Sequence, residues 1–291
     1  MRRKLICCLL ALALAVPAAA AVPEPVFDVS EAVLARALAL DAASRRGLRP
    51  VGWIDLLAAA AAAQGGGEFP ASAVDAAALA MTGGMGPRQL LGDDYAAYGR
   101  FRAFYGAVLG GLAEDGALTA YSPIAAGWDY THYADFGDRR TYGFDRLHLG
   151  NDLLADEGTP VIAIEGGTVT ALGWNRYGGW RVGVRSDDGL RYYYYAHLRR
   201  DCPYAPGLAA GSRVAAGDVL GYVGRTGYSD VENTENLTVP HLHLGLQLYP
   251  DWPGPECWVD VYALVELLDG HRAAVTPVPG TGHWQRAAPP A

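Results

Sequence analysis

The hydrophobic pattern of the chain changes near its middle, and this change limits the folds that the chain can adopt. From about Ser30 to Glu114 the sequence is rich in alanine and leucine, and its apolar residues recur at helical spacing. From Leu147 onward, short β-branched and aromatic runs alternate with glycine-containing turns. The pattern predicts an α+β protein, in which a small helical N-terminal domain precedes a mostly antiparallel β domain.

The helical half is expected to contain several helices separated by glycine-rich breaks. The predicted segments are 30–46, 52–64, 70–81 and 93–114. In the last segment one helical stripe is aromatic and aliphatic, which is typical of core packing, so we assign it no catalytic role. The stripe comprises Tyr95, Tyr98, Arg102, Tyr105, Leu109 and Leu112.

The same patterns predict the domain boundaries. We expect a signal peptide at 1–21, a helical domain at 22–122, a connecting segment at 123–146, a β-rich domain at 147–270 and a loose C-terminal tail at 271–291. The connecting segment is expected to lie over the β-rich domain. It contains His132 and Asp135, which we interpret as solvated loop residues.

The N-terminus has the pattern of a secretory signal peptide. Positions 2–4 are basic, Leu5 to Val16 form a short apolar stretch, and Pro17 with the alanines after it offers a cleavage site. An uncleaved membrane anchor is the alternative. No other stretch is long and apolar enough to cross a bilayer. We therefore expect a secreted protein of the cell envelope or periplasm, with no membrane span after signal removal.

Charge and cysteine content exclude some functions and leave one question open. The net charge is −8, and no basic stripe is visible. Nucleic-acid binding is therefore not expected, because phosphates require positive charge. Cys202 and Cys257 lie outside the signal segment. In an oxidising compartment they could form a disulfide, and two free thiols are the alternative.

Four histidines of the strand-rich half occupy positions that a sheet could bring together. His241 and His243 are two residues apart, so on a strand they face the same side. His148 and Asp152 are four apart and also share a side if the backbone is extended. Gly150, between them, would allow a close approach of another backbone segment. Imidazole and carboxylate groups together are donors that zinc prefers.

The number of these donors favours a catalytic zinc site. A catalytic zinc takes three protein ligands and keeps a fourth position for water, whereas a structural site uses four ligands and tends toward cysteine. His148, His197, His241, His243 and Asp152 exceed the three ligands that are needed. The helix-borne H-E-x-x-H motif and the serine motif G-x-S-x-G are both absent.

In this order, the motifs resemble those of the lysostaphin-type (LytM-like) peptidoglycan metalloendopeptidases. The matching stretches are His148 to Asp152, Gly158 to Val161, Tyr195 to Leu198, Gly221 to Ser229 and His241 to His243. They cover about a third of the chain, roughly residues 145 to 250. A single stretch would be weak evidence, whereas the ordered set is specific.

The resemblance implies a secreted zinc metalloendopeptidase with a zinc-floored groove in its β domain. It implies that His148, Asp152 and His243 bind one zinc ion. It further implies that His197 and His241 assist proton transfer and stabilise the tetrahedral intermediate. The implied substrate is the peptide stem of bacterial peptidoglycan, cut at a glycine or D-alanine linkage.

Some features depart from the family pattern. Residues 230–240 form a longer link than usual, which we expect to be a groove-edge loop, and Leu244 stands where phenylalanine is common. The helical half lies outside the resemblance, so it could dock on the β domain, cover the groove or bind another envelope protein. Four aromatic residues are candidates for lining the groove, and ordinary packing is their alternative. They are Tyr142, Trp174, Tyr177 and Trp180.

Two other functions are compatible with parts of this pattern. One is a non-hydrolytic peptidoglycan-binding scaffold or activator on the same fold, although such relatives typically lose ligands. The other is a zinc D-alanyl dipeptidase or carboxypeptidase, which also has a final His-x-His motif. Their first histidine and aspartate are spaced further apart than His148 and Asp152, which favours the endopeptidase.

Overall fold

The computed structural model of the chain describes residues 27–141, 145–249 and 257–288. The chain divides into two compact units, one with residues 1–117 and 251–257 and the other with residues 118–250 and 258–291. The predicted signal peptide lies outside the described residues, as does Tyr142. Within the described ranges, no helix combines the length and the apolar character that a bilayer crossing requires.

The first unit is helical, as the sequence predicts. Its elements are α1 (Glu31–Ser44), α2 (Trp53–Ala63), α3 (Ala71–Thr82), α4 (Pro87–Leu91), the 3-10 helix η1 (Gly92–Asp94) and α5 (Tyr95–Leu109), followed by β1 (Ala113–Glu114). Helix α2 packs against α1, α3 and α5 and buries an alanine run, 58–62. Alanine has a small side chain, so the neighbouring helices can approach this face closely.

The stripe predicted on α5 is only partly correct. Tyr98 and Tyr105 are buried as expected, but Arg102 is exposed and pairs with Asp55. The buried face also includes Phe101 and other residues outside the predicted stripe. The difference arises because several α5 faces contact neighbouring helices, while the polar end of Arg102 stays in water.

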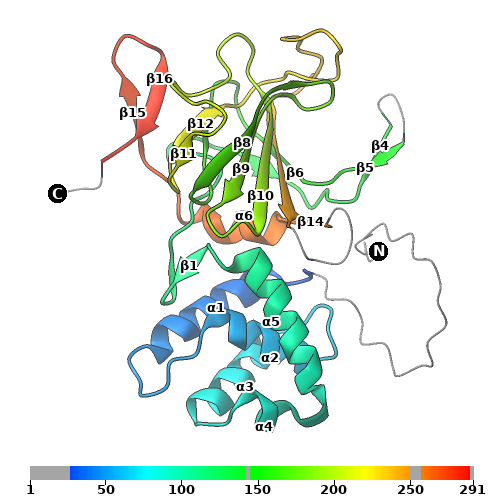
Figure 1. Cartoon of the computed structure of the whole chain (residues 1–291), viewed down its shortest axis with the longest axis vertical. Helices are drawn as coiled ribbons and strands as arrows, with labels where there is room; N and C mark the ends of the chain where they lie inside the picture. Colours follow the sequence, from blue (N-terminus) through cyan, green and yellow to red (C-terminus); the bar gives the residue numbers. More distant parts are fainter. Residues whose placement is uncertain (1–26, 142–144, 250–256, 289–291) are drawn as a thin grey trace. The chain divides into compact units, whose positions relative to one another are not determined.

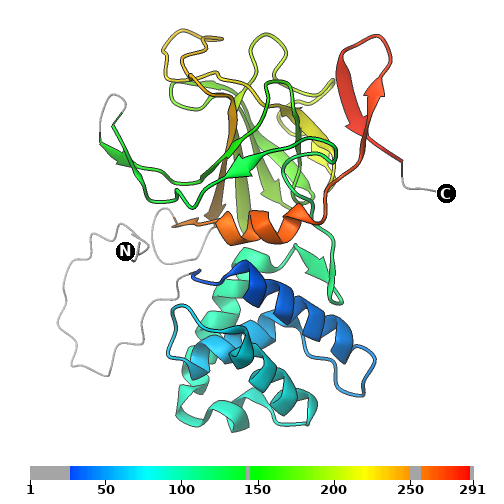
Figure 2. The ribbon, with the colours of Figure 1, turned by 180° about the vertical axis from the view of Figure 1, so that it is seen from behind.

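The second unit is built on an antiparallel sheet with the strand order β11-β8-β9-β10-β13-β6-β3, in which β14 also pairs with β13 (Figure 1). Its strands are β3 (Thr131–His132), β6 (Asn151–Leu154), β8 (Gly167–Asn175), β9 (Gly179–Ser186), β10 (Arg191–Leu198), β11 (Arg213–Val214), β13 (His241–Leu248) and β14 (Cys257–Val259). Helix α6 (Tyr262–Asp269) runs across the ends of the strands (Figure 2). The expected α+β architecture is therefore confirmed.

Smaller strand pairs complete this unit. They are β4 (Arg139–Arg140) with β5 (Arg146–Leu147), β7 (Pro160–Ile162) with β12 (Val219–Tyr222), and β15 (Val275–Val278) with β16 (His283–Arg286). A separate two-stranded sheet, β1 with β2 (Ala117–Leu118), follows α5 in the chain and is not part of this set. The predicted connecting segment thus supplies β3 and β4, which pair with strands of the β-rich unit.

The C-terminal segment, expected as a loose tail, contains the hairpin β15–β16. The backbone N–H of Trp284 donates to the hydroxyl of Tyr222 at 3.0 Å, and the rings of Trp284 and Trp128 are 4.9 Å apart. Both tryptophans pack on a core cluster that includes Tyr222 and Ile162. Burial of aromatic rings stabilises the hairpin, although its sequence has no strong period.

Strand β10 divides its tyrosines between the two faces of the sheet. Tyr193 and Tyr195 are buried on one face, while Tyr192 and Tyr194 lie on the other. Consecutive side chains of a strand point to opposite faces of the sheet, because the side-chain period of a strand is two residues. The face with Tyr192 and Tyr194 also carries the candidate site.

The N-terminal end of β10 is fixed by a buried ion pair. Arg191 is fully buried and binds Glu165 through two hydrogen bonds of 2.8 and 2.9 Å. The hydroxyl of Tyr193 donates to the same carboxylate at 2.9 Å. Bidentate geometry and an additional donor satisfy the buried charges. Cys202 and Cys257 are both free thiols in the structure.

Candidate metal centre

Antiparallel pairing between β13 and β6 brings distant residues of the chain together. In this register His243 lies opposite Asp152, and His241 lies opposite Leu154. His241 and His243 share a face of β13, while Leu242 is fully buried on the other face. The expectation that the two imidazoles face one side agrees with this register.

His148 joins these residues from the segment just before β6. Its side chain is buried, and its backbone is held by hydrogen bonds with Asp138 and Gly137 at 2.8 and 2.7 Å. The side chains of His148, Asp152 and His243 each contribute one donor atom to a compact group. The Nε2 atom of His148 lies 2.8 Å from Nδ1 of His243 and 3.0 Å from Oδ1 of Asp152. Nδ1 of His243 lies 3.1 Å from the same oxygen.

This geometry fits zinc. Ligands bonded at about 2.0–2.1 Å in a tetrahedron lie roughly 3.3 Å apart, slightly more than the separations seen here. Two imidazole nitrogens and one carboxylate oxygen form a donor set that zinc accepts. Small side-chain shifts would therefore admit the ion without a change of backbone.

The pKa shifts of the three donor residues also bear on the binding of a cation. Burial raises the pKa of Asp152, but hydrogen bonds from His148 and His243 outweigh it and hold that pKa well below the ordinary value. Burial lowers the pKa of His148, whereas Asp135 and Asp152 raise it, with a net result of about 9. Burial lowers the pKa of His243. The carboxylate is therefore ionised, and zinc binding must displace the proton of His148.

His197 approaches the same site from a bulge in β10. The pairing of β10 with β9 shifts register between Tyr195 and Leu198, and His197 has a left-handed φ of 61°. Bulges redirect side chains in this way and are frequent beside active sites. The Nδ1–H of His197 donates to the carbonyl of Thr226 at 2.8 Å, which leaves Nε2 without its proton in the neutral ring. Burial lowers the pKa of His197 well below its ordinary value, so the ring is neutral at pH 7.

His241 is oriented by a similar contact. Its Nδ1–H donates to the carbonyl of Val239 at 2.9 Å, and its Nε2 lies 3.8 Å from Oδ1 of Asp152. The ring centroids of His197 and His241 are 4.9 Å apart. Backbone carbonyls thus hold both rings through Nδ1. The Nε2 atom of each ring is left to accept and release a proton.

Asp135 and Arg140 also contribute to the site, contrary to the interpretation of Asp135 as a solvated loop residue. The Asp135 carboxylate lies 3.2 Å from Nδ1 of His148 and accepts a hydrogen bond from Arg140 at 2.8 Å. Arg140 also donates to Asp152 at 3.0 Å. Carboxylates that contact the far nitrogen of a ligating histidine fix its ring and tautomer. His132 is half-buried and stacks on Tyr262, so it was also misinterpreted as solvated.

No motif in the sequence identified these two residues. Asp135 and Arg140 lie in a stretch without a clear period, and only the pairing of β4 with β5 brings Arg140 beside His148. The alternation of acidic and basic residues before His148 is the one signal that could have suggested this contact.

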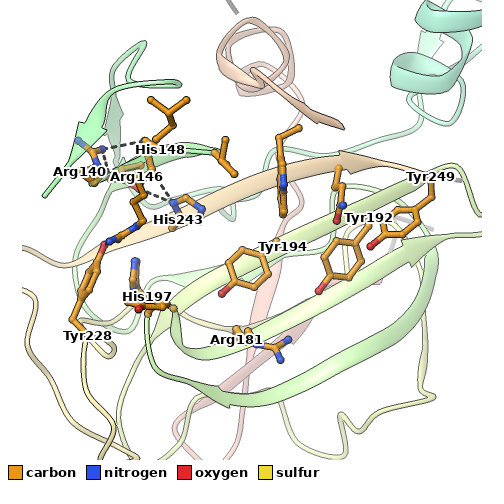
Figure 3. Close-up of a pocket in the computed structure, with 17 residues that line it drawn as sticks. Arg140, Arg146, His148, Arg181, Tyr192, Tyr194, His197, Tyr228, His243 and Tyr249 are labelled. Carbon is orange, nitrogen blue, oxygen red and sulfur yellow. Dashed lines mark hydrogen bonds and ion pairs between the residues drawn. The ribbon is translucent and has the colours of Figure 1, made fainter. Parts of the chain in front are cut away.

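A pocket of about 470 Å³ contains the metal centre (Figure 3). Of the aromatic residues proposed from the sequence, Tyr177 lines it, whereas Trp174 and Trp180 do not. Trp174 donates to the carbonyl of Ser229, and Trp180 donates to Asn233. These two tryptophans therefore hold the loops after β12, and ordinary packing was the correct alternative for them.

The structure thus defines an antiparallel β unit with a candidate His–Asp–His metal site in a pocket. Residues 146–251 match the model of Peptidase family M23. This match agrees with the lysostaphin-type resemblance of the sequence.

Parts of two other proteins are similar in sequence to this chain. The L-Ala--D-Glu endopeptidase of Bacillus subtilis (strain 168) is 40% identical over 124 residues, which are 43% of this chain and 36% of that protein. The glycyl-glycine endopeptidase ALE-1 of Staphylococcus capitis is 38% identical over 97 residues, 33% of this chain and 23% of that protein. The chain thus spans about a third or less of the length of these relatives.

A solved structure shares the fold over most of the chain. The lytM structure from Ruminococcus gnavus ATCC 29149 aligns with a TM-score of 0.58, covering 86% of this chain and 91% of that one. The sequences are 23% identical over this alignment, so the likeness concerns the fold.

Proposed function

We propose that the protein is a zinc metalloendopeptidase that hydrolyses peptide cross-links of bacterial cell-wall peptidoglycan. The observation that carries this proposal is the convergence of three zinc donors with His197 in one pocket, where the ring of His241 lies beside that of His197. A non-hydrolytic scaffold would not need this full set. The names of the relatives, which specify endopeptidases, support the same reaction class.

We assign one zinc ion to His148, Asp152 and His243, through Nε2, Oδ1 and Nδ1. A bound zinc ion supplies Lewis acidity, which lowers the pKa of water and polarises a carbonyl group. Asp135 and Arg140 hold the His148 ring and the Asp152 carboxylate in position from outside the donor group.

We assign proton transfer to His197 and His241. Each ring is anchored at Nδ1 and presents Nε2, so Nε2 can accept the proton of an attacking water molecule and return it to the leaving amine. While protonated, the same Nε2–H can donate to the developing oxyanion. The low pKa of His197 keeps it available as a base at neutral pH.

The relatives differ in the linkage that their names specify, L-Ala–D-Glu in one and glycyl-glycine in the other. We propose the peptide stems of peptidoglycan as the substrate of this chain. Peptidoglycan lies outside the cytoplasmic membrane, so we propose export to the envelope or periplasm, in keeping with the N-terminal sequence pattern. The helical unit remains a candidate for binding an envelope protein.

The test is incubation of the full protein with purified cell wall, with and without a chelator, followed by mass analysis of the fragments. We expect zinc-dependent release of peptide fragments. His243→Ala should lose both zinc and activity, because it removes a ligand. His241→Ala should retain most zinc and lose turnover by about 10²-fold or more, because it removes a proton-transfer group.

Two outcomes would contradict these assignments. Full activity of His243→Ala would exclude the proposed zinc site. Release of zinc from His241→Ala as readily as from His243→Ala would mean that ligand and proton-transfer residue are exchanged.

A further inference from the structure

The pocket extends from the metal centre along one face of the sheet. On this face β9 contributes Arg181 and Gly183, and β10 contributes Tyr192 and Tyr194, with Tyr194 paired opposite Gly183. Figure 3 shows Tyr194 and Tyr192 following one another away from His243, with Arg181 beside them. One guanidinium group therefore lies in the part of the pocket beyond the metal donors.

Glycines create the space in which these tyrosines lie. A Cβ atom at Gly183 would collide with the hydroxyl of Tyr192, and one at Gly178 would collide with the hydroxyl of Tyr194. Both phenol rings therefore lie close to the backbone. The volume above them stays open as pocket and is not filled by side chains.

Arg181 differs from the other charged residues of the pocket. Among the described residues, Arg140 is paired with Asp135 and Asp152, and Arg146 lies over the rings of tyrosines on the other side of the site. No carboxylate within the described ranges pairs with Arg181, and its Nε–H is buried without a hydrogen-bond partner. A buried donor without a partner is unfavourable, because it has lost its hydrogen bonds to water.

Arg181 contacts tyrosines through both its side chain and its backbone. Its guanidinium carbon lies 6.0 Å from the ring centre of Tyr194, and its carbonyl accepts a hydrogen bond from Tyr204 at 3.2 Å. The hydroxyl of Tyr194 accepts from Asn175 at 2.9 Å, and its own O–H remains available as a donor. A guanidinium and a phenol thus present donors to the same space. Such a pair suits a planar anion with two acceptor oxygens.

We propose that Arg181, assisted by Tyr194, binds a carboxylate of the peptide substrate, so that the pocket selects an anionic peptide over an uncharged one. The inference rests on the proposed peptidase function and narrows its substrate to stem peptides with a free carboxylate near the cleaved bond. An uncharged glycine peptide leaves Arg181 without a carboxylate partner and binds more weakly. Arg181 is thereby a binding residue that sets specificity.

The experiment compares two stem tetrapeptides that differ in one group, a free glutamate carboxylate or its carboxamide, together with pentaglycine that is acetylated at its N-terminus and amidated at its C-terminus. Dissociation constants are measured by calorimetry on the zinc-loaded full protein, alongside kcat and KM for cleavage. We expect the carboxylate peptide to bind at least about tenfold more tightly than the carboxamide, because only the carboxylate forms a hydrogen bond between two charged groups with Arg181. Arg181→Gln should reduce this ratio to near one, chiefly through KM.

Two variants serve as controls. Arg181→Lys keeps the charge and should retain part of the preference, but it loses the two-donor geometry. Arg213→Gln removes an equal charge from an exposed position on β11, outside the pocket lining, and should leave the ratio unchanged. Zinc content and unfolding curves establish that the variants are folded.

The results separate the two proposals. If the wild-type protein binds both tetrapeptides equally, or if Arg181→Gln weakens both by the same factor, the carboxylate site is excluded even though cell wall is cleaved. If the carboxylate peptide binds selectively but cell wall is not cleaved, the anion site stands and the peptidase function fails. Tighter binding of pentaglycine than of the carboxylate peptide would also exclude the inference.

Discussion

At the scale of single residues, the metal centre depends on Gly150, which has no side chain. A Cβ atom at Gly150 would lie 2.8 Å from Cε1 of His243 and 2.9 Å from its Nε2, and it would collide with the carbonyl of Leu244. Such separations are shorter than van der Waals contact, and the backbone carbonyl cannot move aside easily. Glycine at this position therefore allows the His243 ring to lie against the chain.

Gly150→Ala is consequently expected to displace the His243 ring and weaken zinc binding by about 10- to 100-fold, comparable with the loss of a group that orients a ligand. Zinc affinity is measured by competition with a chromophoric chelator. Gly106→Ala in α5 is the control, because a Cβ there meets open space. An unchanged zinc affinity in Gly150→Ala would show that the site can relax around the methyl group.

The sequence predicted the chemically distinctive residues of this site better than their surroundings. His148, Asp152, His197, His241 and His243 could be selected because their types and order match a motif set, and the structure brings all of them to one pocket or its edge. Their roles as ligands and proton carriers stay predictions. Asp135 and Arg140 could not be selected, because their contacts depend on the path of a segment without periodic pattern.

At the scale of elements, the orientation of His197 depends on a bulge in β10 and on the loop that supports it. The hydroxyl of Thr226 donates to the carbonyl of Leu198 and accepts from the backbone N–H of Trp180, while its carbonyl accepts from His197. Thr226 is fully buried, so no water replaces these contacts. One residue thus joins β9, the bulge and the loop after β12.

Thr226→Val should remove both hydroxyl contacts and destabilise the fold by about 1–3 kcal/mol, because buried backbone groups lose their partners. It should also lower kcat while zinc content stays unchanged, since His197 is displaced but the three donors are not. Urea unfolding, metal analysis and cleavage rates measure the three effects. Thr226→Ser keeps the hydroxyl and is expected to remain close to wild type; a loss in Thr226→Ser as large as that in Thr226→Val would show that the hydroxyl contacts do not account for the effect.

The alternation of apolar residues and glycine turns was sufficient to predict strands, but bulges and small strand pairs escaped prediction. The left-handed φ of His197 has no signature in "YYYYAHL", because only a small share of histidines adopts that conformation and the local sequence does not mark which ones do. The C-terminal hairpin was also missed. Its stability comes from tryptophan and tyrosine contacts with a distant core, which local patterns do not record.

At the scale of the whole molecule, the site and the helical half belong to different units. The five histidine and aspartate residues of the site, together with the described pocket lining, fall in the unit that contains residues 118–250 and 258–291. This unit has its own core and its own hydrogen-bonded sheet. A chain of this length can bury enough apolar surface to fold without further domains.

We therefore expect a fragment of residues 118–291 to fold alone and to bind one zinc ion with the affinity of the full protein. Circular dichroism, cooperative unfolding and zinc titration of the fragment test this, and the same fragment with His243→Ala serves as the metal-free control. A fragment that unfolds, or that folds without binding zinc, would mean that the helical unit is needed to form the site. If the fragment binds zinc normally but cleaves cell wall more slowly than the full protein, the helical unit acts on substrate access or on binding to the wall, because the donor group itself would be intact.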